Sequence, residues 1–214
     1  MSTRAEEAGL DREWFLRALL VLQAPRAVFA ALRDDSDAAA YARQEPLLAL
    51  TWLAGIAGVL TSSVARTLLD DPVRDGLVVA VWAFIGGGIY AAAVFWLGGA
   101  LLHGASHALG GQGSYRRARH VVGFACAPLA LSLVLLWPVG LAAFGGDLFR
   151  TGGSDGGTGG DVLIWTAIAF GLWALALLVI GIRAVHGWTW PRSVATLALA
   201  ASPVVLLTLV HEFL

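Results

Sequence analysis

The chain has 214 residues, of which 58% are hydrophobic and only 14% are charged. An ordinary water-soluble domain has roughly 45–50% apolar and about 25% charged residues, so the composition excludes such a domain. The net charge of −1 leaves no overall positive field that would attract nucleic acid. The single cysteine, Cys126, excludes a disulfide within one chain. All 14 basic residues are arginine, which is typical of a GC-rich prokaryotic genome.

Residues 1–46 form a polar N-terminal segment with six arginines and eight acidic residues. Apolar residues recur in it at spacings of three and four, which is the pattern of one face of an α-helix. This stripe consists of Leu10, Trp14, Ala18, Val21 and Leu22. We therefore predict that the segment is amphipathic and lies in the cytoplasm.

A second, shorter helix is predicted to begin at Pro25, because proline suits the first turn of a helix. Its apolar stripe contains Val28, Phe29 and Leu32, and the helix is expected to end before Asp34 and Asp35. Both helices could lie on the membrane surface or pack against the rest of the chain. The periodicity fits either arrangement.

Five apolar runs follow, each close to the roughly 17–25 residues that cross a hydrocarbon core of about 30 Å. The runs are 47–69, 77–102, 121–144, 162–182 and 193–210. Pro46, Asp75 and Asp161 stand where the first, second and fourth helices would start. The sequence thus predicts an all-α polytopic membrane protein, with a five-helix transmembrane domain at 47–214.

The distribution of arginine predicts the orientation of these helices, because arginine near helix ends is retained in the cytoplasm. Eleven arginines fall on the side of the N-terminus, and three, Arg66, Arg74 and Arg150, fall on the other side. The N-terminus is therefore predicted to be cytoplasmic and Leu214 to be outside an inner or plasma membrane. The glycine-rich stretch 150–161 would form a flexible external loop.

Glycine and proline recur inside the apolar runs. The second run has a small-residue face that includes Gly86–Gly88, Gly98 and Gly99, and the later runs contain Pro128, Pro138 and Pro203. Small residues permit close helix packing, and proline permits kinks that could open a cavity between the third and fifth helices. No acid or base lies near the middle of a run, which weakens an ion or proton pathway.

Three histidines occur in the segment 103–120, at His103, His107 and His120. His103 and His107 are one helical turn apart, a spacing that can bind a metal. Two ligands do not complete a site, and His120 would have to fold back to join them. The alternative is that these histidines are polar residues at the membrane interface, so metal candidates remain weak and we expect no cofactor.

The same segment contains three arginines, Arg116, Arg117 and Arg119, after a glycine-rich turn. They could bind lipid phosphate at the start of a helix, or they could serve only to retain the loop in the cytoplasm. The pattern lacks the lysine of a phosphate loop, and the chain has no recognisable hydrolytic or HExxH motif. We therefore expect that the protein is not an enzyme.

Three stretches of the sequence resemble the Yip domain family, the Ypt- or Rab-interacting membrane proteins. The stretches are APRAVFAAL, ALLHGASHALGGQGSYRRARHVVGFACAPLAL and GIRAVHGWTWPRSVAT. The resemblance covers nearly the whole chain and implies a cytoplasmic N-terminus and five spans. Eukaryotic relatives bind small GTPases and act in vesicle traffic, whereas a prokaryotic member would share the architecture and the membrane location.

The leading hypothesis is a non-enzymatic membrane-organising or partner-binding protein of the Yip type, in contact with membrane lipids and with a protein partner at the cytoplasmic face. The residues expected to bind the lipid or the partner are Trp14, Phe15, Phe29, Arg116, Arg117 and Arg119. The competing hypothesis is a small-molecule or lipid transporter with a channel-like cavity.

Overall fold

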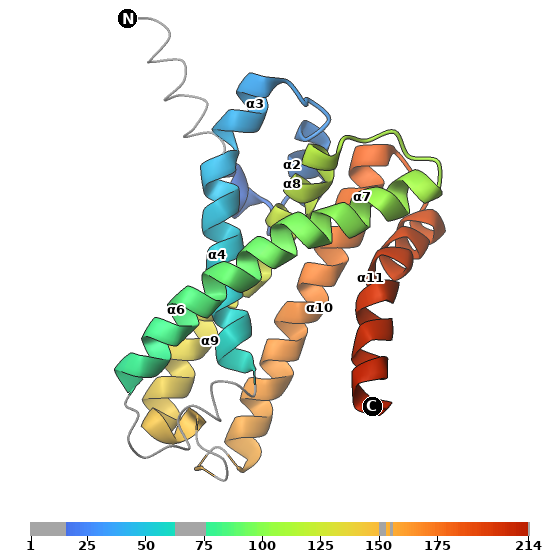
Figure 1. Cartoon of the computed structure of the whole chain (residues 1–214). Helices are drawn as coiled ribbons and strands as arrows, with labels where there is room; N and C mark the ends of the chain where they lie inside the picture. The colour runs from blue at the N-terminus through green and yellow to red at the C-terminus, as the bar shows by residue number, and fades with distance from the viewer. Residues whose placement is uncertain (1–15, 63–75, 150–152, 155, 214) are drawn as a thin grey trace, which may run out of the picture.

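The computed structural model describes residues 16–62, 76–149, 153, 154 and 156–213, and these residues form helices and turns without a strand (Figure 1). The helices are α2 (Pro25–Ala31), α3 (Asp37–Ala42), α4 (Gln44–Thr61), α6 (Gly76–Ala93), η1 (Val94–Gly98), α7 (Gly99–Ala108), α8 (Tyr115–Ala125), α9 (Ala127–Phe144), η2 (Gly145–Phe149), α10 (Thr158–His186) and α11 (Trp190–Phe213). The predicted all-α class is confirmed.

Four of the described helical segments are long and apolar enough to cross a membrane. They are Gly76–Ala108, Tyr115–Leu148, Thr158–His186 and Trp190–Val210. Each extends beyond the run predicted from apolar residues alone, because the backbone hydrogen bonds of a helix continue through polar residues at its ends. The loop predicted at 150–161 is shorter than expected, because α10 already begins at Thr158.

The first predicted run, 47–69, coincides only partly with a described helix. Helix α4 has 18 residues, and Gln44 and Glu45 in its first turn lower its average hydropathy. It is not among the four segments, and residues 63–75 lie outside the described part of the chain. The count of five spans therefore stays a prediction.

The third run contains a break that its proline predicts. Helix α8 ends at Ala125, Cys126 forms the junction, and Pro128 lies in the first turn of α9. Proline has no backbone N–H to donate, so it is tolerated in a first turn but disrupts a helix interior. Pro138 and Pro203 lie inside α9 and α11, as predicted.

The predicted glycine face of the second run packs against two helices, with Gly86–Gly88 against α4 and with Gly98 and Gly99 against α8. A Cβ atom added at Gly87 would lie 2.7 Å from the backbone nitrogen of Ile56, and one added at Gly55 would collide with the carbonyl oxygen of Gly87. Helices α4 and α6 therefore cross with their backbones in contact, which is the function of small residues in membrane helix packing. At this crossing the glycines serve packing and not a cavity.

The described part of the N-terminal segment, residues 16–46, packs on the helix bundle. The side chains of Val28, Phe29 and Leu32 are buried in one core with residues of α8 and α10. A Cβ atom at Gly181 of α10 would lie 3.0 Å from the ring of Phe29. The short helix α3, which was not predicted, follows and is capped by the Ser36 hydroxyl.

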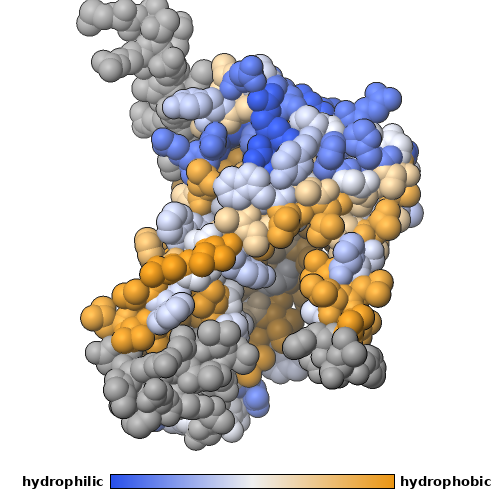
Figure 2. All heavy atoms as spheres, in the orientation of Figure 1, coloured by the Kyte–Doolittle hydropathy of each residue, from blue (hydrophilic) through white to orange (hydrophobic). Residues whose placement is uncertain are grey.

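Polarity divides the molecule into two ends (Figure 2). Hydrophilic residues gather at the end that carries α2, α3 and α8, and hydrophobic residues cover the body below it. Helices α10 and α11 expose many apolar residues, and every residue of 203–210 on α11 is exposed. Such surface is unfavourable in water and suits a lipid environment.

Candidate functional site

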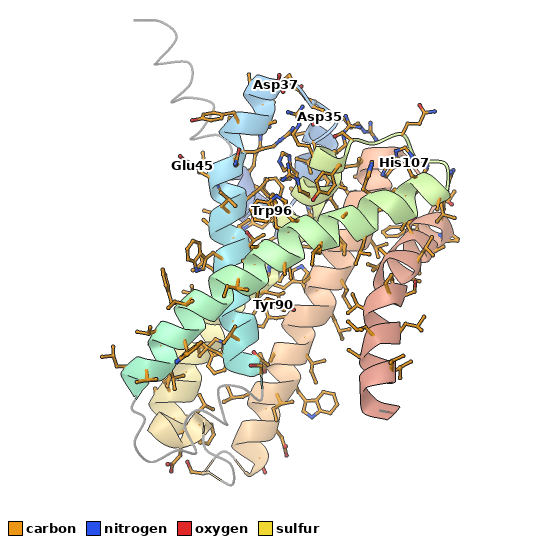
Figure 3. The ribbon with its side chains drawn as sticks, viewed as in Figure 1. Asp35, Asp37, Glu45, Tyr90, Trp96 and His107 are labelled. Atoms are coloured by element: carbon orange, nitrogen blue, oxygen red, sulfur yellow. The ribbon has the colours of Figure 1, made fainter. Side chains whose placement is uncertain are left out.

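The polar end gathers charged side chains from segments that are far apart in the sequence. We use the name Asp35 cluster for Asp35, Arg43, Ser114, Arg116 and Arg117. Asp35 lies in the link between α2 and α3, Arg43 precedes α4, and the other three lie at the start of α8. Figure 3 labels Asp35 and the neighbouring Asp37 above the ribbon of α8.

Asp35 is the centre of the cluster. Its carboxylate accepts hydrogen bonds from the Ser114 hydroxyl and from Nε of Arg116, the latter at 3.1 Å. Nη2 of Arg43 lies 3.6 Å from one carboxylate oxygen, and Nη2 of Arg117 lies 3.9 Å from the other. One partly buried carboxylate therefore faces three guanidinium groups.

Arg43 is the largest fully buried side chain of the described residues. Its Nη2 donates to the carbonyl oxygen of Asp34 at 2.9 Å in addition to its ion pair with Asp35. A buried cation needs such partners, because the free energy of removing it from water is several kcal/mol. The link between α2 and α3 supplies these contacts and is thereby attached to the start of α4.

The cluster alters the acidity of its members. Burial alone would raise the pKa of Asp35, but the hydrogen bonds from Ser114 and Arg116 and the charges of Arg116 and Arg117 together hold that pKa below its ordinary value of 3.8. Burial lowers the pKa of Arg43, and the charges of Asp35 and Asp34 oppose that change. Arginine stays protonated in proteins, so the cluster is fully ionised at neutral pH.

Ser114 links the cluster to the backbone of α8. Its hydroxyl oxygen accepts a hydrogen bond from the backbone N–H of Arg117 at 3.0 Å and is the N-cap of the helix. The same hydroxyl donates its proton to Asp35. The start of α8 is thus fixed by the carboxylate that also neutralises its arginines.

Further arginines fasten the remaining segments to the polar end. Arg33 donates to the carbonyl oxygen of Ala184 in α10 at 3.0 Å from Nε and 2.6 Å from Nη2. Arg117 donates to the carbonyl oxygen of Arg33 at 2.9 Å, and Arg192 donates to that of Leu109. These contacts join α2, α8, α10, α11 and the turn after α7.

The three arginines predicted to bind lipid or a partner have separate environments. Arg116 forms ion pairs with Asp35 and with Asp37, the latter at 2.7 Å, and keeps 35% of its side-chain surface exposed. Arg117 contacts Asp35. The guanidinium group of Arg119 lies over the rings of Tyr115 and Phe95, at 4.9 and 5.3 Å from their centres. The positive charge of Arg116 and Arg117 is thus opposed by carboxylates within the molecule.

Of the other predicted contact residues, the structure describes only Phe29. Phe29 is 0% exposed and belongs to the core, so it cannot touch lipid or a partner in this arrangement. Trp14 and Phe15 lie outside the described residues. Sequence reasoning missed Asp35 and Arg43, which it interpreted as a helix end and as one more positive charge.

The three histidines are divided between two places. The rings of His103 and His107 lie 4.6 Å apart, as their spacing predicts. His120 is buried and its ring stacks on Phe95 at 6.4 Å. Within the described ranges, no three His, Cys, Asp or Glu residues form a group that could hold a metal ion.

A cavity of about 750 Å³ lies at the opposite half of the molecule. Its walls come from α4, α6, α9 and α10 and include Ala57, Tyr90, Leu136 and Ala167, as well as Leu148 of η2. This cavity differs from the one predicted between the third and fifth helices, because α11 contributes none of its described lining residues. Helix α11 instead packs against α7 and α10.

Comparison with known proteins gives one match. The model of the family described as Yip1 domain matches residues 19–211, which includes α2 and the Asp35 cluster as well as the long apolar helices. No curated protein matches the chain, and no solved structure matches it.

Proposed function

The chain belongs to the Yip1 domain family and is a multi-pass membrane protein, and from this premise we propose that it is a non-enzymatic, partner-binding component that organises the inner membrane. The observation that carries the proposal is the fastening of separate segments of the chain into one polar end by the Asp35 cluster and its neighbouring arginines. A surface held in this way is preorganised, which lowers the entropy lost on binding.

Helix α3 is the part of this end that offers a contact surface. Tyr41 is 77% exposed and the Asp37 side chain is 97% exposed, although both belong to a helix fixed at each end. Ser36 caps its start, and buried Arg43 follows its end. An exposed aromatic side chain on a rigid support is typical of residues that dominate binding energy. We take Asp37, Tyr41 and the exposed part of Arg116 as the partner-binding surface, named the α3 surface.

The proposed topology places this surface in the cytoplasm and has five spans. Helix α4 supports the fifth span, because its 18 described residues extend roughly 27 Å at about 1.5 Å per residue. The orientation rests on the excess of arginine at one end, where Arg33, Arg43, Arg116, Arg117 and Arg192 gather. Leu214 would then be outside the cell membrane.

The proposal is tested by placing a photo-crosslinking amino acid at Tyr41 in the full-length protein in native membranes. We expect a discrete protein adduct, identified by mass spectrometry, whose yield falls at least fivefold when Asp37→Ala is added. The matched control carries the same amino acid at Trp165, which is 69% exposed near the start of α10 at the other end. Absence of an adduct from position 41, or identical adducts from both positions, would contradict the proposal.

A further inference from the structure

The cavity in the half of the molecule remote from the polar end has the chemistry of an apolar ligand site. Its volume of about 750 Å³ lies within the roughly 300–1,000 Å³ of small-molecule sites. No residue of its described lining carries a charge, and most of that lining is alanine, glycine and leucine or isoleucine. A charged or strongly polar substrate would lose its hydration there without compensation.

The serine and threonine hydroxyl groups in the described wall donate to the helix backbone and not to a ligand. Thr61 donates to the carbonyl oxygen of Ala57 at 2.7 Å, and Ser132 donates to that of Leu129 at 2.7 Å. Ser62 likewise donates to the carbonyl oxygen of Val59. Since each hydroxyl has one proton, these three groups have no further proton to donate to a ligand.

The dimensions of the cavity match one leaflet of a bilayer. Along α9 its lining extends from Leu129 to Gly140, which is roughly 16 Å at about 1.5 Å per residue. This is about half of the ~30 Å hydrocarbon core. The lining residues of α10, from Gly160 to Ile168, lie in the half of that helix that is distant from Arg183 and the polar end.

The cavity can be reached from the side of the bundle. Ile164 and Ile168 of α10 and Tyr90 of α6, which Figure 3 labels, are among its lining residues and are each about half exposed. These side chains lie on apolar helices, so the entrance faces the region that lipid tails occupy. A ligand already dissolved in the membrane enters without crossing water.

From these observations we infer that the cavity binds an acyl chain of a membrane phospholipid in the leaflet remote from the polar end. The absence of charge in the described wall, the satisfied hydroxyls, the one-leaflet length and the lateral entrance all fit this ligand. The inference is independent of the proposed partner at the α3 surface, which lies at the other end of the molecule.

The test uses the full-length protein in nanodiscs that contain a phospholipid with a photoreactive group near the end of one acyl chain. We expect labelled peptides to include the cavity wall of α9, which contains buried Ser132. Ala167→Phe should fill the cavity and lower that labelling at least fivefold. Ala169→Phe is the matched control, because Ala169 is exposed on the same helix and is not a lining residue.

A second filling variant, Ser132→Leu, acts from α9 and shows whether the loss depends on the cavity or on damage to α10. Thermal unfolding and gel filtration of every variant identify proteins that fold. Labelling that both filling variants leave unchanged while they remain folded would overturn the inference. Labelling by a free fatty acid probe but not by the phospholipid probe would overturn the assignment to a phospholipid chain.

Discussion

At the scale of single residues, Asp35 determines the structure of the polar end. Its carboxylate is 18% exposed and faces Arg43, Arg116 and Arg117, and the Ser114 hydroxyl donates to it. The sequence could not reveal this role, because Asp35 and Arg116 are 81 positions apart. Helix propensity and capping explain only the local structure. The acidic residues follow the end of α2, and Ser36 caps the start of α3.

We predict that Asp35→Asn lowers the free energy of unfolding by roughly 3 kcal/mol, because it removes the carboxylate that forms ion pairs with the buried Arg43 and with Arg116 and Arg117. The measurement is thermal or denaturant unfolding of the purified protein in detergent. Asp37→Asn is the control, since solvent screens its exposed ion pair with Arg116 and makes that pair much weaker. Equal destabilisation by the two substitutions would show that Asp35 is not the centre of the cluster.

The pH dependence of that difference follows from the lowered pKa of Asp35. A carboxyl group with a lower pKa in the folded than in the unfolded state stabilises the fold above its ordinary pKa of 3.8. This contribution is lost as the pH falls through the folded-state value. The stability difference between wild type and Asp35→Asn should therefore stay constant from pH 8 to pH 5 and shrink below about pH 4. A difference that already disappears at pH 6 would contradict this assignment.

At the scale of the elements, the crossing of α4 and α6 depends on glycine. The sequence predicted the glycine face but left its purpose open, and the close approach of Gly87 to Ile56 gives that purpose. The junction at Cys126 has a local cause, because the ring of Pro128 restricts the backbone and removes its N–H donor. Features that depend on residues within one helical turn were therefore easier to predict than contacts between helices.

Gly87→Ala should lower the free energy of unfolding by about 1–3 kcal/mol, because the added methyl group forces two backbones apart. Gly104→Ala is a matched control in α7, where an added Cβ would meet nothing within 4 Å. That control should be neutral or stabilise the helix by up to about 1 kcal/mol. Unfolding experiments on both variants measure the contrast, and an unchanged Gly87→Ala protein would refute the close packing.

At the scale of the whole molecule, the division into a polar end and an apolar body sets the position in the membrane (Figure 2). The described part of the N-terminal segment and the turn between α7 and α8 lie together at the polar end, although long apolar helices separate them in the sequence. A bilayer accommodates this arrangement only if the helices cross it, because polar groups remain at the interface. The remaining question is which end faces the cytoplasm.

The proposed topology predicts the accessibility of single cysteines in a Cys126→Ala background. Gln112→Cys lies in the exposed turn between α7 and α8, and Gly156→Cys lies exposed just before α10. In intact cells a membrane-impermeant maleimide should label Gly156→Cys, and it should label Gln112→Cys only after permeabilisation. A tag after Leu214 should be accessible outside. The reverse pattern would invert the orientation, and a cytoplasmic tag would exclude five spans.

The sequence by itself determined the properties that depend on composition and on local periodicity. These include the all-α class, the apolar runs, the helix at Pro25 and the family resemblance. They follow from hydropathy, from helix geometry and from the restricted backbone of proline, none of which requires a distant contact.

Only the tertiary structure decided what each surface faces. It buried Phe29 against Gly181, attached Arg116 to Asp35, and formed a cavity between α4, α6, α9 and α10. The physical reason is that an amphipathic stripe fits lipid and protein equally well, and an arginine fits phosphate and carboxylate equally well. The partner is set by the packing of segments that the chain brings together only when it folds.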